Sequence, residues 1–480
     1  MAGKTKKYKD LAVNTVVFSI SSFGSKILTF LLVPLYTSLL STAEYGIADV
    51  ITSTSSLLIF VLTLNIADSV LRFAIERKEK QEEILSFGLK VQFYGALVLS
   101  AGLFVIRQLG ILNWADHCYV FLLLIFFSNA VNMSVTSYLR AVNKVKDVAV
   151  SGIIQTASMI TSNILCLIVF RMGIVGYLLS ILIGMLISSL YCFIRIGTPI
   201  TDILKSAPDK IVRKDMIKYS TPLIFNGVAW WMNSSLDKYF IISIVGVGAS
   251  GIYAVAAKIP TILKMFNQIF SQAWNLSAIH EYDKDDKDGF FSNMYSVYNA
   301  GMVLSCSVLI LFNVFLAKIL YAKDFFVALN YTSPLLISVV FSALSSFIGS
   351  IFSAVKNSKI YAVSTVAAAI VNTILNAVLI PRWGIQGAAI ATAVSFFTIW
   401  IIRFICVQKY IKLKINLKRD VLAYILLSVQ AVIEHYNGHN YLYQGAIICV
   451  LLLIYFKELK MILVQLPALA DKFLHKNRKK

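Results

Sequence analysis

The sequence predicts an all-α polytopic membrane protein of about 14 transmembrane helices, with two parallel six-helix repeats followed by two C-terminal helices. Three observations lead to this fold class. The 480-residue chain is 58% hydrophobic and 14% charged, with a mean hydropathy of +0.76, whereas soluble chains are about 45–50% apolar and about 25% charged. Apolar runs near the ~20 residues that cross a bilayer as a helix recur from end to end. The third observation is an internal duplication.

Four sequence matches, in the same order along the chain, indicate this duplication. Gly46 and Gly251 each open an apolar run about 205 residues apart, and Leu99-Ser100 matches Leu304-Ser305 at the same offset. Further along, Arg171–Gly176 recurs as Arg382–Gly387, and the segment 141–151 recurs as 354–364. Parallel repeats of this kind in transporters are related by an axis along the membrane normal, with the substrate path between them.

The apolar runs divide the chain into four parts. We expect an N-terminal six-helix lobe at 1–197, a cytoplasmic linker at 198–218, a second six-helix lobe at 219–409, and two extra helices with a basic tail at 410–480. The predicted spans are 11–40, 44–75, 84–106, 116–139, 147–170, 174–196, 219–244, 249–279, 289–320, 328–354, 358–380, 385–408, 421–436 and 441–464. Six spans are an even number, so both lobes enter the membrane from the same side.

The net charge of +20 is placed so as to set topology, which argues against binding to nucleic acid. Lysine and arginine cluster on every second connection and at both ends of the chain, while the alternate connections are nearly bare. The positive-inside rule therefore places both termini in the cytoplasm, and we expect a multi-pass membrane protein.

No constellation for catalysis, metal binding or nucleotide binding stands out. The six cysteines lie singly in apolar runs, the five histidines have no ligand spacing, and no phosphate-cradling glycine motif is present. The outward connections are all short. We therefore expect neither an enzyme nor a bound cofactor or metal, and coupling to a Na⁺ or H⁺ gradient is left open.

Four predicted spans carry polar side chains along one face, which packing alone explains poorly because ionisable groups in hydrocarbon are costly. They are the first two spans of each lobe. The candidate substrate-binding residues on them are Lys26, Asp68, Arg72, Lys258, Lys264 and Gln268. Two structural alternatives stay open: a local ion pair between Asp68 and Arg72, and a pair between Asp237 and Lys258. Lys26 and Lys264 have no acid within one helical turn in the sequence.

The chain resembles the oligosaccharide flippases of the MATE-like multidrug/oligosaccharidyl-lipid/polysaccharide exporter superfamily. The resemblance rests on Pro34 to Gly46, on Asp237 followed by Gly251–Lys258, and on the Gly384/Gly387 turn. It implies translocation of an undecaprenyl-diphosphate-linked repeat unit by alternating access, for O-antigen or capsule-type polysaccharide. The implied partners are the lipid-linked oligosaccharide and membrane lipids, with other polysaccharide-assembly proteins as candidates. We expect a monomer.

The same resemblance implies an ion-coupling site. Some lipid flippases of the superfamily hold sodium with an acid, an asparagine or aspartate pair and a threonine on their seventh, eleventh and twelfth helices. The residues here that resemble this set are Asp237, Asn372, Asn376 and Thr392. Oxygen ligands of this kind suit a hard cation. Asn376 departs from the pattern because it has no carboxylate, so proton coupling through Asp237 is an alternative.

Two other functions compete with the flippase. A cation-coupled drug or small-molecule antiporter of the same superfamily would favour an acid-rich cavity, against which the lysines argue. A membrane glycan polymerase or ligase would need a sizeable outward loop with catalytic groups, which the short outward connections do not supply.

The topology predicts which positions face outward. In a variant without native cysteines, single cysteines at Ala43 and Ala249 should react with an impermeant thiol reagent applied to intact cells, because both lie on bare connections. A cysteine at Gln81, on a basic connection, should react only after permeabilisation. Labelling of position 81 in intact cells would contradict the predicted orientation.

Overall fold

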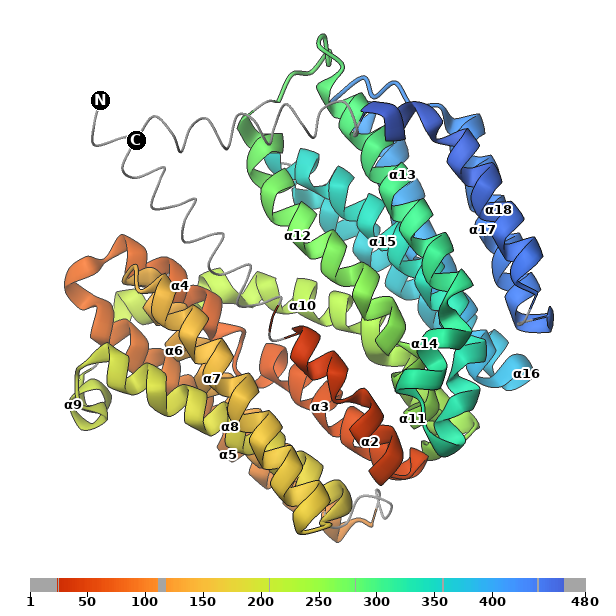
Figure 1. Ribbon diagram of the computed structural model, residues 1–480. Helices are drawn as coiled ribbons and strands as arrows, with labels where there is room; N and C mark the ends of the chain where they lie inside the picture. The colour runs from red at the N-terminus through yellow and green to blue at the C-terminus, as the bar shows by residue number, and fades with distance from the viewer. Residues whose placement is uncertain are drawn as a thin grey trace, which may run out of the picture. The chain divides into compact units, whose positions relative to one another are not determined.

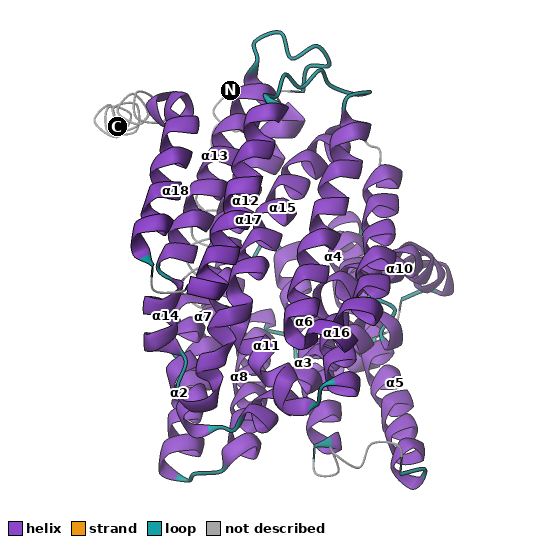
Figure 2. Cartoon of the chain, turned by 90° about the vertical axis from the view of Figure 1, so that its right-hand side faces the viewer, coloured by secondary structure: helices purple, strands orange, loops and turns teal. Residues whose placement is uncertain are grey.

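The computed structural model describes residues 24, 26–110, 118–206, 208–280, 282–355, 358–437 and 440–461. Within these ranges every regular element is a helix, joined by short turns and loops (Figure 2). Eight of the helical segments are long and apolar enough to cross a bilayer. The predicted all-α polytopic class is therefore confirmed. Most of the first predicted span, 11–40, lies outside the described residues.

The first half of the chain folds into the helices that cover the first six predicted spans (Figure 1). They are α2 (Val33–Leu39), α3 (Thr42–Leu62), α4 (Ile66–Glu76), α5 (Gln81–Gln108), α6 (Tyr119–Ala141), α7 (Val145–Asn163), α8 (Gly173–Ile196) and α9 (Ile200–Lys205). A 3₁₀ turn at Lys78–Lys80 precedes α5, and a π-helical segment at Ile164–Val169 continues α7.

The second half continues with longer and more often interrupted helices. They are α10 (Lys210–Ile244), α11 (Val247–Ala256), α12 (Lys258–His280), α13 (Phe290–Leu311), α14 (Asn313–Leu320), α15 (Leu329–Ala354), α16 (Ser358–Val407), α17 (Leu417–Asn437) and α18 (Tyr441–Ile454). A 3₁₀ turn at Lys323–Ala328 leads into α15.

The chain forms two compact units. Unit 1 comprises Met1–Ile242 and Gly246–Gly251, and unit 2 comprises Ser243–Val245 and Ile252–Lys480. Almost all of α10 therefore packs in unit 1, although the sequence repeat counts it as the first span of the second lobe. Contacts and repeats divide the chain at different points, and the lobe boundaries at 198–218 stay a prediction from the repeat.

Helix junctions occur at matching places in the two repeats. Gly173, at the start of α8, has a φ of +54°, and Gly384, which interrupts α16, has the same value. The junction between α6 and α7 likewise corresponds to the junction between α15 and α16. Because only glycine adopts this backbone region without a Cβ penalty, the two glycines explain why the chain turns at these points.

Two further breaks divide single predicted spans into two helices. The span 44–75 becomes α3 and α4 because Leu64 and Asn65 adopt left-handed backbone conformations. The span 249–279 becomes α11 and α12, and α11 ends at Ala256, four residues before Pro260. A proline ring clashes with the carbonyl four residues earlier, so the helix cannot continue unbroken through this point.

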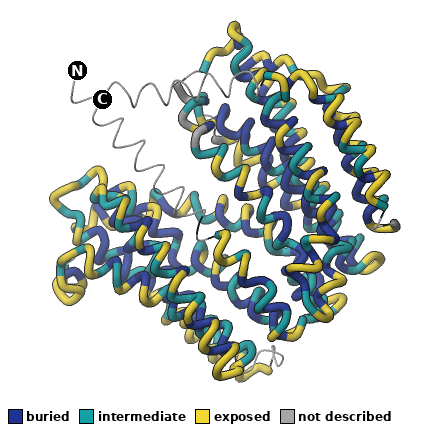
Figure 3. The backbone as a smooth tube through the Cα atoms, in the orientation of Figure 1, coloured by how far each residue is buried: buried dark blue, intermediate teal, exposed yellow. Residues whose placement is uncertain are grey.

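Each unit has its own packed interior (Figure 3). In unit 1 a cluster of buried apolar residues joins α4, α5, α6, α8, α9 and α10 around Val70, Leu85 and Met216. In unit 2, α15 is the central helix: nearly nine-tenths of its most apolar stretch is buried. α12, α13, α16 and α17 pack around it.

The acidic loop before α13 is a helix cap. The Asp286 carboxylate accepts hydrogen bonds from the backbone N–H groups of Phe291 and Ser292, both at 3.0 Å, at the first turn of α13. Asp285 pairs with Lys412 at 3.0 Å, and the hydrogen bond from this lysine lowers the pKa of the Asp285 carboxyl. Asp286 thus satisfies free N–H groups at the start of α13.

In unit 1 the backbones of α3 and the start of α11 approach each other closely. A Cβ on Gly251 would overlap the carbonyl oxygen of Thr42 and would lie 3.0 Å from the backbone nitrogen of Gly46. A Cβ on Gly46 would in turn overlap the carbonyl oxygen of Val247. Both obstacles are backbone atoms, which cannot move aside by a change of rotamer.

Gly251→Ala is therefore expected to destabilise the fold by about 1–3 kcal/mol, the usual effect of overpacking. Thermal unfolding in detergent, followed by tryptophan fluorescence, measures the change. Gly102→Ala on α5 is the matched control, because nothing lies within 4 Å of its would-be Cβ. If both variants unfold at the wild-type temperature, the α3–α11 contact does not require glycine.

Candidate functional site

An ion pair joins α3 and α10 inside unit 1. Lys238 lies 2.7 Å from the Asp49 carboxylate and donates a hydrogen bond to Ser53 Oγ at 2.8 Å. The Trp231 indole N–H donates to the Ser53 carbonyl at 2.8 Å. Asp49 and Ser53 are one turn apart on α3, and Trp231 and Lys238 are two turns apart on α10, so each pair shares one helix face.

The pair is largely removed from solvent, with 14% of the Lys238 side chain and 18% of the Asp49 side chain exposed. Loss of one member of a buried pair leaves a charge without its partner, which typically costs about 3–5 kcal/mol. The tyrosine that follows Lys238 adds a further link, since the hydroxyls of Tyr239 and Thr54 lie 2.6 Å apart. This polar contact ties the seventh predicted span to the second.

The polar face predicted on the second span therefore contacts another helix, α10. The residues of α10 in this contact are different from those predicted. On the seventh predicted span, at 219–244, helical spacing predicts a polar face made of Asn226, Trp230, Asn233 and Asp237. Asn226 and Trp230 are exposed, whereas Asn233 and Asp237 are buried. The residues of α10 that contact α3 are the neighbouring positions in the helix, which a difference of about 100° in rotation explains.

Asp68 and Arg72 do not form the ion pair considered from the sequence. Arg72 lies 2.9 Å from Glu76 and stacks over the Tyr219 ring at 4.5 Å. Asp68 accepts a hydrogen bond from Asn65 Nδ2 at 2.7 Å. Asp68 therefore supports the left-handed turn before α4, in the first turn of that helix, where a negative charge is favourable.

The four predicted cationic and amide groups fall in two units. Lys26, in the helical turn before α2, is half-buried in unit 1. Lys258 opens α12 and is half-buried, while Lys264 is exposed and Gln268 lies one turn further on the same helix. Unit 2 thus brings Lys264 and Gln268 onto one face of α12.

Three of the four predicted ion-coupling residues lie on α16 of unit 2. Asn376 donates a hydrogen bond to Asn372 Oδ1 at 3.0 Å, and both side chains are fully buried. Thr392, beyond the break at Gly384, lies 3.2 Å from the Tyr253 hydroxyl and donates to the Ala388 carbonyl. Asp237 belongs to unit 1, where it is 1% exposed.

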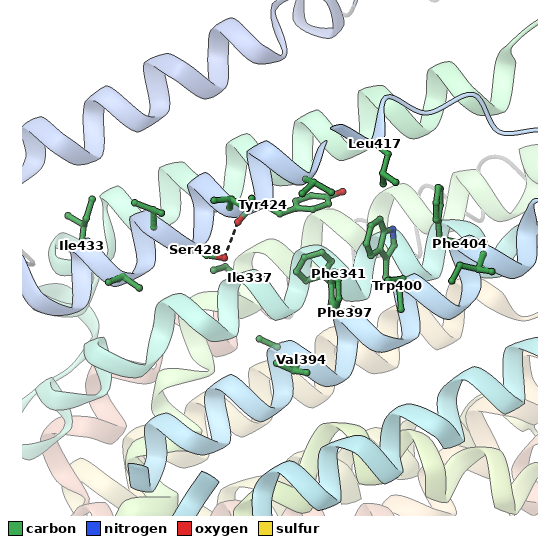
Figure 4. Close-up of a pocket in the computed structure, with 17 residues that line it drawn as sticks. Ile337, Phe341, Val394, Phe397, Trp400, Phe404, Leu417, Tyr424, Ser428 and Ile433 are labelled. Carbon is green, nitrogen blue, oxygen red and sulfur yellow. Dashed lines mark hydrogen bonds between the residues drawn. The ribbon is translucent and has the colours of Figure 1, made fainter. Parts of the chain in front are cut away.

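An apolar groove of about 850 Å³ runs between α15, α16 and α17 of unit 2 (Figure 4). A second hollow of about 580 Å³ shares five lining residues with it and extends it towards Pro334, Gln386 and His435. The groove is lined by aliphatic and aromatic side chains, among them Ile337, Phe341, Val394, Phe397, Trp400 and Tyr424.

The groove is apolar because its polar atoms are bonded elsewhere. Ser428 donates its hydroxyl to the Tyr424 carbonyl at 2.9 Å, the dashed line in Figure 4. The Tyr424 hydroxyl donates to Asn299 Oδ1 at 3.0 Å, and the Trp400 indole N–H donates to the Tyr295 hydroxyl at 2.9 Å. A ligand in the groove would therefore contact aliphatic side chains and the faces of aromatic rings, and this surface suits an apolar chain.

Sequence reasoning missed this groove and one buried cation. Its lining residues come from three helices that are separate in the sequence. In a sequence, an apolar residue that faces a groove cannot be distinguished from one that faces lipid. Arg403, which is 3% exposed, donates to Ser364 Oγ and to the Ser345 carbonyl at 2.9 Å and lies over the Tyr361 ring. The signal that the sequence offers for this buried cation is a single arginine near the end of an apolar run.

Comparison with solved structures defines the class of protein. The fold matches the lipid II flippase MurJ in an inward closed conformation, with a TM-score of 0.69 and 15% identity over 94% of this chain and 99% of that one. It also matches an inward-facing multidrug resistance MATE family transporter of the MOP superfamily, with a TM-score of 0.64 and 14% identity over 80% and 95%. The chain is a multi-pass membrane protein with a MATE-like fold.

Sequence comparison places it more narrowly. The polysaccharide biosynthesis protein family matches residues 11–275, and the chain belongs to this family. It is 25% identical over 345 residues to a probable low-salt glycan biosynthesis flippase of Haloferax volcanii, covering 69% of this chain and 70% of that protein. It is 24% identical over 429 residues to an uncharacterized membrane protein of Methanocaldococcus jannaschii, covering 84% and 99%. The suspected membership of a polysaccharide biosynthesis family is confirmed.

The Asp49–Lys238 pair predicts a non-additive pattern of stability. Asp49→Asn and Lys238→Met should each lower the unfolding temperature, because each leaves one group without its partner. The double variant should be more stable than the sum of the two losses implies, by about 0.5–3 kcal/mol of coupling. Unfolding temperatures of the four proteins in detergent measure the cycle, and strict additivity would show that the contact contributes nothing.

Proposed function

We propose that this chain translocates a lipid-linked oligosaccharide across its membrane. More specifically, we propose that the cargo is an undecaprenyl-diphosphate-linked repeat unit. The chain would carry this unit from the cytoplasmic to the outer leaflet for surface polysaccharide assembly. The observation that carries the proposal is the apolar groove on unit 2 of a transporter in the polysaccharide biosynthesis family. A drug carrier does not need a long groove of this kind, whereas a cargo with a hydrocarbon tail does.

The cargo has three parts with different physical needs. Its tail is soluble in hydrocarbon and suits the groove beside α17. Its diphosphate is anionic and needs cationic partners, for which Lys26, Lys258 and Lys264 are the candidates, with Arg72 near the end of α4. Lysine suits a ligand that must later leave, because its ammonium is a mobile point charge rather than a rigid fork.

The proposed setting follows the predicted topology. We place the chain in a bacterial inner membrane with both termini in the cytoplasm, as the basic connections indicate. Lipid-linked oligosaccharide and membrane lipids are the proposed partners, and we expect a monomer. The two relatives compared above are archaeal proteins. The translocation experiment below therefore also tests whether the lipid carrier is undecaprenyl diphosphate.

A cation-coupled multidrug antiporter is the second candidate, and the shared fold with a MATE family transporter favours it. Cationic drugs would need acidic partners. Asp49, an acid on the second predicted span, already pairs with Lys238. This pairing leaves less negative charge available to a cationic drug. Drug efflux in cells that express the chain would support this candidate.

The proposal predicts the behaviour of two lysines in reconstituted vesicles. Lys26→Ala and Lys264→Ala should each reduce translocation of a polyprenyl-diphosphate oligosaccharide at least about tenfold, since a hydrogen bond to a charged group contributes about 1.5–3 kcal/mol. Arginine at either position should restore part of the rate, because it keeps the positive charge. Cleavage of the translocated glycan by an impermeant glycosidase measures the rate.

Lys90→Ala is the matched control. Lys90 lies on a membrane-spanning helix but is not among the predicted substrate-binding residues. Its ammonium donates to the Ser206 carbonyl at 2.9 Å, and the variant should translocate normally. Absence of any protein-dependent translocation would overturn the proposed function. Normal rates for both alanine variants would instead remove only the two lysines from the cargo path.

Ion coupling is proposed from the buried polar groups of each unit. In unit 2 the Asn372–Asn376 pair and Thr392 offer oxygen ligands, and in unit 1 Asp237 offers a buried carboxylate. In the same vesicles, Asp237→Asn should abolish any acceleration by an imposed Na⁺ or H⁺ gradient. Unchanged acceleration would exclude Asp237 as the coupling residue.

A further inference from the structure

Helix α17, outside the sequence repeat, has two different faces. One face lines the apolar groove with Val421, Ile425 and Val429. The other carries buried polar side chains that bond to α13, α14, α15 and α18. From one end of the helix to the other these are Asp420, Tyr424, Gln430 and Glu434. Two of them are carboxylates, and both are almost completely buried.

Glu434 is held by two neutral side chains. Its Oε1 accepts a hydrogen bond from Asn313 Nδ2 at 2.8 Å, and its Oε2 accepts one from the Ser333 hydroxyl at 3.1 Å. Asn313 Nδ2 also donates to the Leu329 carbonyl at 2.9 Å. The side chain of Glu434 is 2% exposed and that of Asn313 is fully buried. The other amide atom of Asn313, Oδ1, has no hydrogen-bond partner among the described residues.

Asp420, at the opposite end of the same helix, has a different environment. It lies 2.9 Å from Arg419 and accepts a hydrogen bond from the Tyr455 hydroxyl at 3.3 Å. Arg419 also pairs with Glu458. An arginine keeps its proton at every accessible pH, so Asp420 faces a fixed positive charge that favours the ionised form of its carboxyl group. The two buried acids of α17 thus differ in that only Asp420 has a cationic partner among the described residues.

The groups around Glu434 that carry or can carry charge are few. His435 follows it on α17, where its ring lies edge-on to Tyr436 with centroids 5.1 Å apart. The titratable residues on the surrounding helices near this end are Cys306, Lys318, Tyr331, Tyr441 and Tyr443. Lys318, Tyr441 and Tyr443 are exposed. The contacts of Glu434 that the structure gives are those with Asn313 and Ser333.

Amide and hydroxyl partners can serve both states of a carboxyl group. An ionised carboxylate only accepts hydrogen bonds, whereas a protonated one also donates one. Asn313 now presents an N–H to Glu434, and rotation of the amide would present the unpartnered Oδ1 as an acceptor for a Glu434 O–H, with loss of the hydrogen bond from Nδ2 to the Leu329 carbonyl. Ser333 can likewise donate or accept. A buried carboxyl in a membrane is costly when charged and lacks this cost when neutral, so a partner set that suits both states favours exchange.

We propose that Glu434 is a reversible proton-binding site within the membrane. Protonation takes one H⁺ from the aqueous phase and forms one O–H bond at a carboxylate oxygen, with no change in oxidation state. One turn away, Gln430 bonds to Ser307 and to Gln444 through neutral hydrogen bonds, which extends the polar surroundings of the site. Because the other face of α17 lines the groove, the site is well placed to sense the occupancy of that groove.

Infrared difference spectroscopy of the purified full-length chain tests the proposal without any cargo. Lowering the pH should produce a carbonyl band of a protonated carboxylic acid in a buried setting, and Glu434→Gln should remove the equivalent of one carboxyl group from it. Asp420→Asn is the matched control, a buried acid on the same helix, and it should leave that band in place. The band is specific to carboxylic acids, so titration of His435 does not produce it.

A second variant separates assignment from misfolding. Ser333→Ala keeps the titrating group but removes one of its hydrogen bonds, and it should shift the frequency of the band while the protein stays monodisperse. A band that is unchanged in both Glu434→Gln and Ser333→Ala would overturn the proposal. Loss of the band on addition of Na⁺ at constant pH would also overturn it in favour of a sodium site. Neither result depends on which cargo the chain carries, so the proposed function is tested separately.

Discussion

The structure depends on the absence of water in the bilayer interior, where a backbone N–H or C=O without a partner costs several kcal/mol. Helices satisfy these groups within one segment, and every regular element in the described ranges is a helix. The places where helices break are therefore specialised. Asn65 bonds to Asp68 at the break between α3 and α4. Gly384 supplies the left-handed turn in α16, and Pro260 follows the end of α11 by four residues.

Polar side chains obey the same constraint and thereby join the helices. Lys238 on α10 finds Asp49 and Ser53 on α3, and Arg403 finds oxygens on α15 and α16. Such contacts are costly to leave incomplete, so they specify which helix faces meet more strictly than aliphatic packing does. In unit 1 this explains why α10 packs with the first repeat, although the sequence repeat assigns it to the second.

Helix α17 shows how one segment serves two environments. Its apolar face and the aromatic residues of α15 and α16 leave a groove whose polar atoms are all turned to partners behind the wall. Its polar face carries Asp420, which pairs with an arginine, and Glu434, which an amide and a hydroxyl hold. The two C-terminal helices thus add both a lipid-compatible surface and titratable chemistry to the duplicated core.

The sequence by itself determined the all-helical membrane class and the approximate positions of most apolar spans, because hydropathy acts on its local stretch of chain. It did not predict the breaks that divide the spans 44–75 and 249–279. It located the junctions near Gly173 and Gly384 and the family resemblance. Only the tertiary structure decided that Lys238 pairs with Asp49 and that three helices enclose a groove. Those outcomes depend on how helices far apart in the chain are rotated against one another, and hydropathy does not encode that rotation. The roles of Lys26 and Lys264 stay predictions for the same reason.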